Sequence, residues 1–146
     1  MERLRIAQIG TLFEPVTDSS KNGLSQIVYV LTQELVDLGH DVTLYAPLSS
    51  STNAKLIPLS DFSGASETIL GKVLPVAAAF ADWRNFDIIH DHTRFYSILF
   101  AHLLPIRLVS TVHHPIEFEE LHWNYPAEPY RVYFKAIWER LVKRVA

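Results

Sequence analysis

Short apolar runs that alternate with amphipathic stretches constrain the fold of this chain more than any other feature. The run LRIAQIG, residues 4–10, has the composition of a buried strand and leads into a polar loop over residues 11–23. Over residues 24–38 apolar positions recur at helical spacing, and Gly39 is a typical helix stop. The run DVTLYA, residues 41–46, indicates a second strand. Strand, helix and strand in this order predict a parallel βαβ unit.

The same alternation continues through the rest of the chain. Pro75 is expected to kink or split the helix in which it lies. The further expected elements are a weak strand at 55–59, a helix at 66–83, a strand at 86–90, a helix at 93–104, a strand at 107–112 and a helix over about 130–145. This pattern predicts one α/β, Rossmann-like, three-layer domain over residues 1–146, with a mainly parallel sheet flanked by helices.

Composition and charge exclude several functional classes. Hydrophobic residues make up 49% of the 146-residue chain, which is enough for one core. The net charge of −3 argues against nucleic-acid partners, which require clustered basic residues. The chain has no cysteine, no secretory signal pattern and no apolar run of about 20 residues, so we expect a cytoplasmic protein. Peripheral contact of an amphipathic surface with a membrane stays open.

Polar residues follow the predicted strands at the points where the strands end. Because the carboxyl ends of parallel strands meet at one edge, where ligands of open α/β sheets bind, these residues are the candidates for a site. Four of the seven histidines belong to this set. Its members are Thr11 after the first strand, His90, Asp91, His92 and Thr93 after the third strong strand, and His113 and His114 after the fourth.

A metal site is one interpretation of these histidines. In an extended chain His90 and His92 point to the same side, and His113 or His114 could approach from the neighbouring strand to complete a zinc site. Asp91 would point away, so no carboxylate completes the coordination sphere. We therefore favour hydrogen bonding over metal binding and expect no metal.

A dinucleotide site is the second interpretation, because a strand opens a βαβ unit. The signature GxGxxG is missing, since Gly10 is followed only by Gly23. The start of the first helix, at Asn22 and Gly23, can still present backbone N–H groups to an anion.

Several segments together resemble one known family. These are LRIAQIGTLFEPV, the NG dipeptide before LSQIVYVLTQELVDLGHDVTLYA, the strand FDIIHDHT and the strand LVSTVHHP. They resemble the N-terminal domain of family 4 glycosyltransferases with the GT-B fold. The resemblance implies a retaining, metal-independent enzyme, without cofactor, that moves a sugar from a nucleotide-sugar donor to an acceptor. It also implies that this domain holds the acceptor and that a C-terminal domain holds the nucleotide.

The resemblance assigns roles to individual residues. His92 and His113 are the expected catalytic residues: His92 faces the acceptor side, and His113 hydrogen-bonds the transferred sugar near the reacting carbon. Gly23 corresponds to the second glycine of a loop beside the donor phosphates, and Asn22 replaces the first. The expected acceptor-binding residues are Thr11, Asp91, Thr93 and His114.

The paired-glutamate motif that the resemblance implies for donor binding is absent from this sequence. We therefore expect the acceptor-side half of an enzyme, inactive alone, that receives its donor through a missing C-terminal domain and acts on a small molecule or glycan. One alternative is a binding module that completes its cleft with a separate protein, using the aromatic stretch at 122–134 as a docking surface or stacking wall. Another is a metal-dependent hydrolase that uses His90, His92 and His113.

Overall fold

In the described part of the chain the sheet has five strands, and every neighbouring pair is parallel. A computed structural model describes residues 2–59, 68–93, 96–101, 103–111 and 113. The strand order is β3 (Lys55–Leu59), β2 (Asp41–Pro47), β1 (Arg5–Ile9), β4 (Ile88–Asp91) and β5 (Arg107–Ser110). The predicted α/β, Rossmann-like fold is confirmed.

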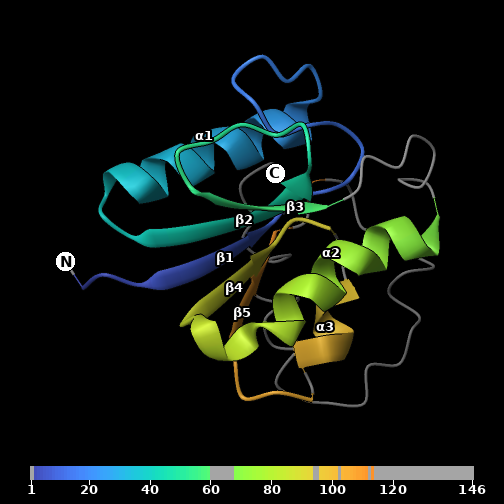
Figure 1. The fold of residues 1–146 in the computed structure, drawn as a ribbon. Coiled ribbons are helices and arrows are strands. Elements are labelled where there is room, and N and C mark those ends of the chain that lie inside the picture. The colour runs from blue at the N-terminus through green and yellow to red at the C-terminus, as the bar shows by residue number, and fades with distance from the viewer. Residues whose placement is uncertain (1, 60–67, 94–95, 102, 112, 114–146) are drawn as a thin grey trace, which may run out of the picture. The chain divides into compact units, whose positions relative to one another are not determined.

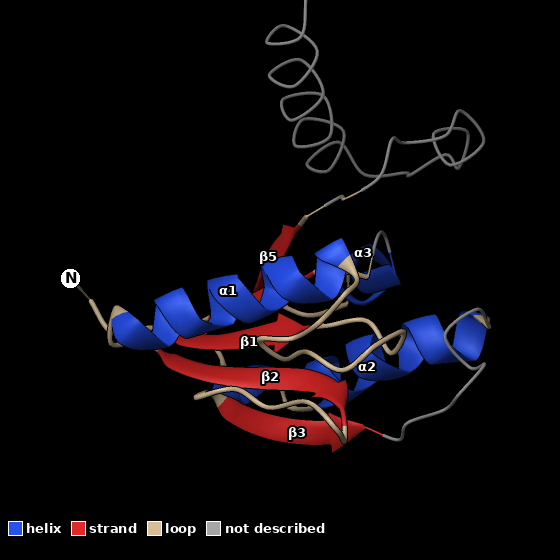
Figure 2. Cartoon of the chain, turned by 90° about the horizontal axis from the view of Figure 1, so that it is seen from above, coloured by secondary structure: helices blue, strands red, loops and turns tan. Residues whose placement is uncertain are grey.

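Helices cover both faces of the sheet. Figure 1 shows α1 (Gly23–Asp37) on one face, and α2 (Ile69–Ala81) and α3 (Tyr96–Ala101) on the other. A 3-10 turn, η2 (Trp83–Asn85), joins α2 to β4. The view in Figure 2 shows α1 running back along β1 and β2, as a crossover between parallel strands requires.

The core has two parts, one on each face, because side chains alternate along each strand. On the α2 face, Ile9 and Ile89 pack with Val76 and Phe80. On the α1 face, Leu44 of β2 packs with other buried residues, namely Val16, Val28 and Ala46. Burying an Ile or Leu side chain contributes about 2 kcal/mol, so these two clusters dominate the stability of the fold.

The boundaries of α1 have clear local causes. The side-chain oxygen of Asn22 accepts a hydrogen bond from the backbone N–H of Leu24 and caps the first turn. Gly39 has a φ of +88°, a left-handed conformation that favours glycine, and its N–H donates to the carbonyl of Val36. The predicted helix start and stop are both confirmed.

The structure differs from the sequence-based expectations in three elements. Pro75 does not split α2, which continues through it as one helix with Pro75 buried. The strand expected at 86–90 begins at Ile88, because Phe86 terminates η2. The described part of α3 is shorter than the expected helix at 93–104. The helix expected near 130–145 and the aromatic stretch at 122–134 lie outside the described residues. None of the described helices has the length and apolar character that crossing a bilayer requires.

Candidate functional site

The strand order reverses direction between β1 and β4, and this position determines where a ligand can enter. The helix after β1 covers one face, whereas the helix after β4 covers the other. In open parallel sheets this switch point leaves a crevice at the carboxyl ends of the strands. The predicted site residues after β1, β4 and β5 therefore belong to the correct edge.

A continuous chain of hydrogen bonds lies at this switch point. Gln8 is paired with His90 across β1 and β4, so its side chain lies on the same face as those of His90 and His92. The Nε2 atom of His92 lies 2.9 Å from Oε1 of Gln8, and its Nδ1 atom lies 2.9 Å from Nε2 of His113. The structure thus brings the two histidines that the sequence singled out into direct contact. We call Gln8, His92 and His113 the relay.

The orientation of the Gln8 amide determines the protons of the relay: its oxygen faces His92, and its Nε2 is buried without a hydrogen-bond partner. An amide oxygen only accepts, so Nε2 of His92 carries the proton and donates it to Gln8. Nδ1 of His92 is then an acceptor, and Nε2–H of His113 donates to it. One buried side chain on β1 therefore sets the tautomers of both histidines.

His92 and His113 differ in how far they are buried. His92 is 2% exposed and both of its ring nitrogens are hydrogen-bonded, whereas His113 is half-buried. Burial, and then the charges of His90 and His113, lower the pKa of His92 to about 2. His92 is therefore neutral at physiological pH. Its position suits orienting His113, and the expectation that His92 faces the acceptor side stays a prediction.

His90 extends this group of rings. Its ring centroid lies 4.2 Å from that of His92, and its Nε2 lies 2.7 Å from Oγ1 of Thr111 after β5. Burial, followed by the charge of His113, lowers the pKa of His90 to about 4. His90 is therefore also neutral at physiological pH.

Asp91 and Thr93 do not join the relay. The side chain of Asp91 alternates with those of the flanking histidines and points to the α3 face, where it is fully buried. Its Oδ1 accepts from the N–H and hydroxyl of Thr93, at 2.7 and 2.6 Å, and its Oδ2 accepts from the hydroxyl of Ser97 at 2.5 Å. The polar groups of both residues thus build the turn into α3, and their contact with the acceptor stays a prediction.

The start of α1 carries an anion that belongs to the chain itself. The two carboxylate oxygens of Glu14 accept from the backbone N–H groups of Lys21 and Asn22, at 3.0 and 2.7 Å. Gly23 is exposed, and nothing lies within 4 Å of where a Cβ would stand. The two N–H groups before the predicted phosphate loop are thus already occupied, while the approach to Gly23 is open.

The other predicted residues fall at the margins of the site. Thr11 follows β1 and is half-buried. His114 lies outside the described residues. Within the described ranges, no group of three or more His, Cys, Asp or Glu side chains is arranged to hold a metal ion.

Comparison with known families now identifies the chain. The model of the family described as Glycosyltransferase Family 4 matches residues 21–146, most of the 146-residue chain. The chain belongs to glycosyltransferase family 4. The match is to the N-terminal domain of the family, as the resemblance implied. No curated protein matches the chain significantly.

Membership in family 4 gives the relay its chemical setting. A family 4 glycosyltransferase works with a nucleotide-sugar donor and an acceptor.

Sequence reasoning missed two residues of the site, Gln8 and Glu14. Gln8 precedes the matched residues, and its one signal is a polar side chain inside an otherwise apolar strand. Glu14 gives no signal in the sequence, because its partners are backbone N–H groups reached through the folded loop.

Proposed function

We propose that this chain is the acceptor-side domain of a retaining, metal-independent glycosyltransferase that transfers a sugar from a nucleotide-sugar donor to an acceptor. His113 is the catalytic residue that contacts the transferred sugar. His92 and Gln8 are positioning residues that act through His113. By itself the domain is inactive, because the donor is held by a second domain and transfer requires both reactants in register.

The observation that carries this proposal is the relay at the switch point. Its buried end is Gln8, which is 0% exposed, and its outer end is the half-buried His113. The relay therefore starts in the core and ends where the fold admits a ligand. A side chain fixed in this way is pre-organised, which is what orientation of a reacting sugar requires.

The role of His113 follows from the charge that develops on the sugar. When the bond from the anomeric carbon to the donor phosphate breaks, the sugar becomes oxocarbenium-like while the acceptor oxygen forms the new bond. An imidazole held in one orientation and one tautomer stabilises this arrangement without reorganising during the step. The neutral His92 supports this role because it adds no positive charge beside the developing cation.

The donor phosphates are assigned to the start of α1. The helix dipole and the free N–H groups of a first turn favour an anion there. Asn22 shapes this loop by capping the helix, and the exposed Gly23 leaves room for close approach. Backbone groups then provide the charge stabilisation that a metal would provide in a metal-dependent transferase.

The test compares the isolated chain with the complete natural polypeptide that contains it. With nucleotide sugars and a panel of acceptors, we expect turnover only from the complete polypeptide, with retention of the anomeric configuration and no loss in excess chelator. His113→Ala should lower kcat by about 10²-fold or more, since it removes a group aimed at developing charge. His40→Ala is the matched control, because His40 lies after the far end of α1. Robust transfer by the isolated chain, or an equal loss in both variants, would refute the proposal.

A further inference from the structure

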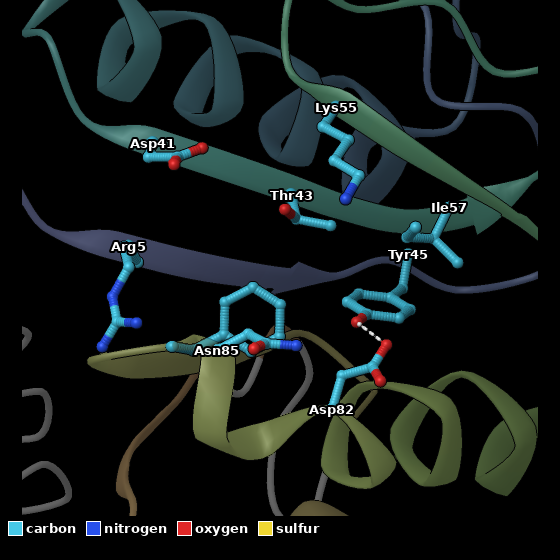
Figure 3. A pocket seen from close by; sticks show the side chains of 9 residues that line it. Arg5, Asp41, Thr43, Tyr45, Lys55, Ile57, Asp82 and Asn85 are labelled. Atoms are coloured by element: carbon cyan, nitrogen blue, oxygen red, sulfur yellow. Dashed lines mark hydrogen bonds between the residues drawn. The ribbon is translucent and has the colours of Figure 1, made fainter.

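A second hollow lies far from the relay, on the other face of the sheet. It has a volume of about 190 Å³ and is lined by the amino-terminal halves of β2 and β3, by the start of β1 and by the end of α2 with η2. Figure 3 shows the ammonium end of Lys55 and the phenol of Tyr45 entering it from the sheet, opposite Asp82 and Asn85. We call this the amino-end pocket.

The polar side chains of the amino-end pocket are largely uncommitted. Among the described residues, the side chains of Asp41, Lys55 and Asn85 form no hydrogen bond or ion pair with one another or with their surroundings. All three are exposed, and they come from three different elements. A hollow that gathers an acceptor-only carboxylate, a donor-only ammonium and a two-way amide can satisfy a ligand that both donates and accepts.

One wall of the amino-end pocket is fixed. Tyr45 is 1% exposed and its hydroxyl donates to Oδ2 of Asp82 at 3.0 Å. Burial and the contact with Asp82 raise the pKa of Tyr45, so the phenol stays protonated and keeps donating. Phe86 meets the ring of Tyr45 edge-on, with the centroids 6.2 Å apart. The pocket thus combines a fixed, hydrogen-bonded wall with exposed polar groups.

The charges that line the amino-end pocket balance one another. The guanidinium of Arg5 is bound to both oxygens of Asp87, at 2.7 and 3.2 Å, and its charge also acts on Asp41. The lining carries two cations, Arg5 and Lys55, and two carboxylates, Asp41 and Asp82. An anion would meet the two carboxylates, and a cation would meet the ammonium of Lys55. A neutral molecule with several hydroxyl groups meets no such penalty.

We propose that the amino-end pocket binds one neutral sugar ring. Hydroxyl groups both donate and accept, so they match Asp41, Lys55 and Asn85 together, and the half-buried Phe86 offers an aromatic surface to the apolar face of a pyranose. The volume lies below the roughly 300–1,000 Å³ of sites for drug-sized ligands, so it admits a single ring and not a nucleotide sugar. This site lies outside the proposed catalytic site and does not depend on its role.

The experiment is saturation-transfer NMR on the full 146-residue chain, with methyl α-glucoside, methyl α-mannoside and methyl α-galactoside as probes. At least one glycoside should receive magnetisation from the protein. Asp41→Ala and Asn85→Ala should each weaken its binding by about fivefold, as expected for one lost hydrogen bond. Asp37→Ala removes an exposed carboxylate of α1 and should change nothing. Circular dichroism verifies that each variant is folded.

His113→Ala separates this site from the proposed catalytic one, because binding in the amino-end pocket should survive it unchanged. The proposal is overturned if no glycoside receives magnetisation, or if Asp41→Ala and Asn85→Ala bind as well as the parent chain. It is also overturned if no glycoside binds while glycine or pyrophosphate does bind and Asp41→Ala weakens that binding. Loss of transferase activity in the complete polypeptide would bear on the proposed function and leave this result untouched.

Discussion

The two ends of the sheet use polar residues in opposite ways. At the carboxyl end, Gln8 and His92 are buried, bonded at short distance and neutral. At the amino end, Asp41, Lys55 and Asn85 are exposed, charged or polar, and unbonded within the described residues. The first arrangement fixes one geometry in advance. The second leaves groups free to adapt to a ligand.

This contrast connects burial with function. Most buried polar groups are hydrogen-bonded and so hold another group in place, although Nε2 of Gln8 and Oγ1 of Thr32 are buried without a partner in the described part of the chain. An exposed polar group without a protein partner is hydrogen-bonded to water, so leaving it unpaired costs little free energy. A ligand can replace that water. We therefore expect substitutions at the carboxyl end to change rates and stability strongly, and substitutions at the amino end to change only weak binding.

The largest effect should follow from breaking the inner link of the relay. In the complete polypeptide, Gln8→Leu removes the acceptor for His92 and should lower kcat by about 10²-fold with little change in KM, because misorientation acts in the transition state. Steady-state kinetics measures both constants. Gln8→Glu keeps an acceptor oxygen and should recover part of kcat. A rise in KM alone, or no recovery in Gln8→Glu, would mean that Gln8 has only a packing role.

The turn after β4 should be structural rather than functional. Asp91→Ala leaves the hydroxyl of Ser97 and the N–H of Thr93 without their buried acceptor and should lower the free energy of unfolding by about 2 kcal/mol. Urea denaturation of the isolated chain measures this. Asp91→Asn keeps one acceptor oxygen and should cost less. Unchanged stability together with weakened acceptor binding would instead support the assignment of Asp91 to the acceptor site.

Acid should destabilise the carboxyl end through its histidines. The pKa is about 2 for His92 and about 4 for His90 in the folded chain, both below the ordinary value of 6.5. Between the folded pKa of each histidine and 6.5, the unfolded chain therefore binds more protons than the folded chain. Stability therefore falls as the pH drops below 6.5, by at most about 1.4 kcal/mol per pH unit for each group. Asp91, whose pKa is raised by burial, acts in the opposite direction above pH 3.8.

Denaturation curves between pH 7 and 5 test this slope. His92→Gln should make it shallower, whereas His40→Ala, which changes a histidine outside the relay, should leave it as it is. A stability that stays constant or increases on acidification to pH 5 would contradict the buried, neutral state of His92.

The sequence was informative where one local signal decides the structure. Apolar runs located all five strands, and Asn22 and Gly39 bounded α1, because caps and strand burial are local properties. The sequence also placed His92 and His113 at the same edge, since parallel strands end together. The split at Pro75 that the sequence allowed does not occur, because local propensity does not include the packing around this buried residue.

The amino-end pocket could not be predicted in the same way. Its residues come from separate segments near positions 5, 41–45, 55–57 and 82–86, and only the strand order 3-2-1 brings them together. The partner of Gln8, His92, is distant in the sequence, and the partners of Glu14 are backbone N–H groups. Neither arrangement produces a recognisable residue spacing in the sequence. A sequence indicates which residues follow the ends of parallel strands. It does not indicate which residues of separate strands and helices come together in a pocket.

The smallest expected effect concerns Glu14, a half-buried carboxylate before the start of α1. Its carboxylate occupies the N–H groups of Lys21 and Asn22, where it competes with an incoming phosphate through both charge and contact. Glu14→Gln removes the charge and should strengthen binding of inorganic pyrophosphate to the isolated chain by about threefold, the scale of one charge at a helix start. Titration calorimetry at low salt measures this.

Glu34→Gln is the matched control, because Glu34 is an exposed glutamate near the far end of the same helix. It changes the net charge equally, so an equal gain in both variants would reduce the effect to general electrostatics. Weaker binding in Glu14→Gln would mean that the carboxylate shapes the loop for the donor rather than blocking it. A gain confined to Glu14→Gln would mean that the start of α1 is an anion site held closed by the chain's own carboxylate until a donor displaces it.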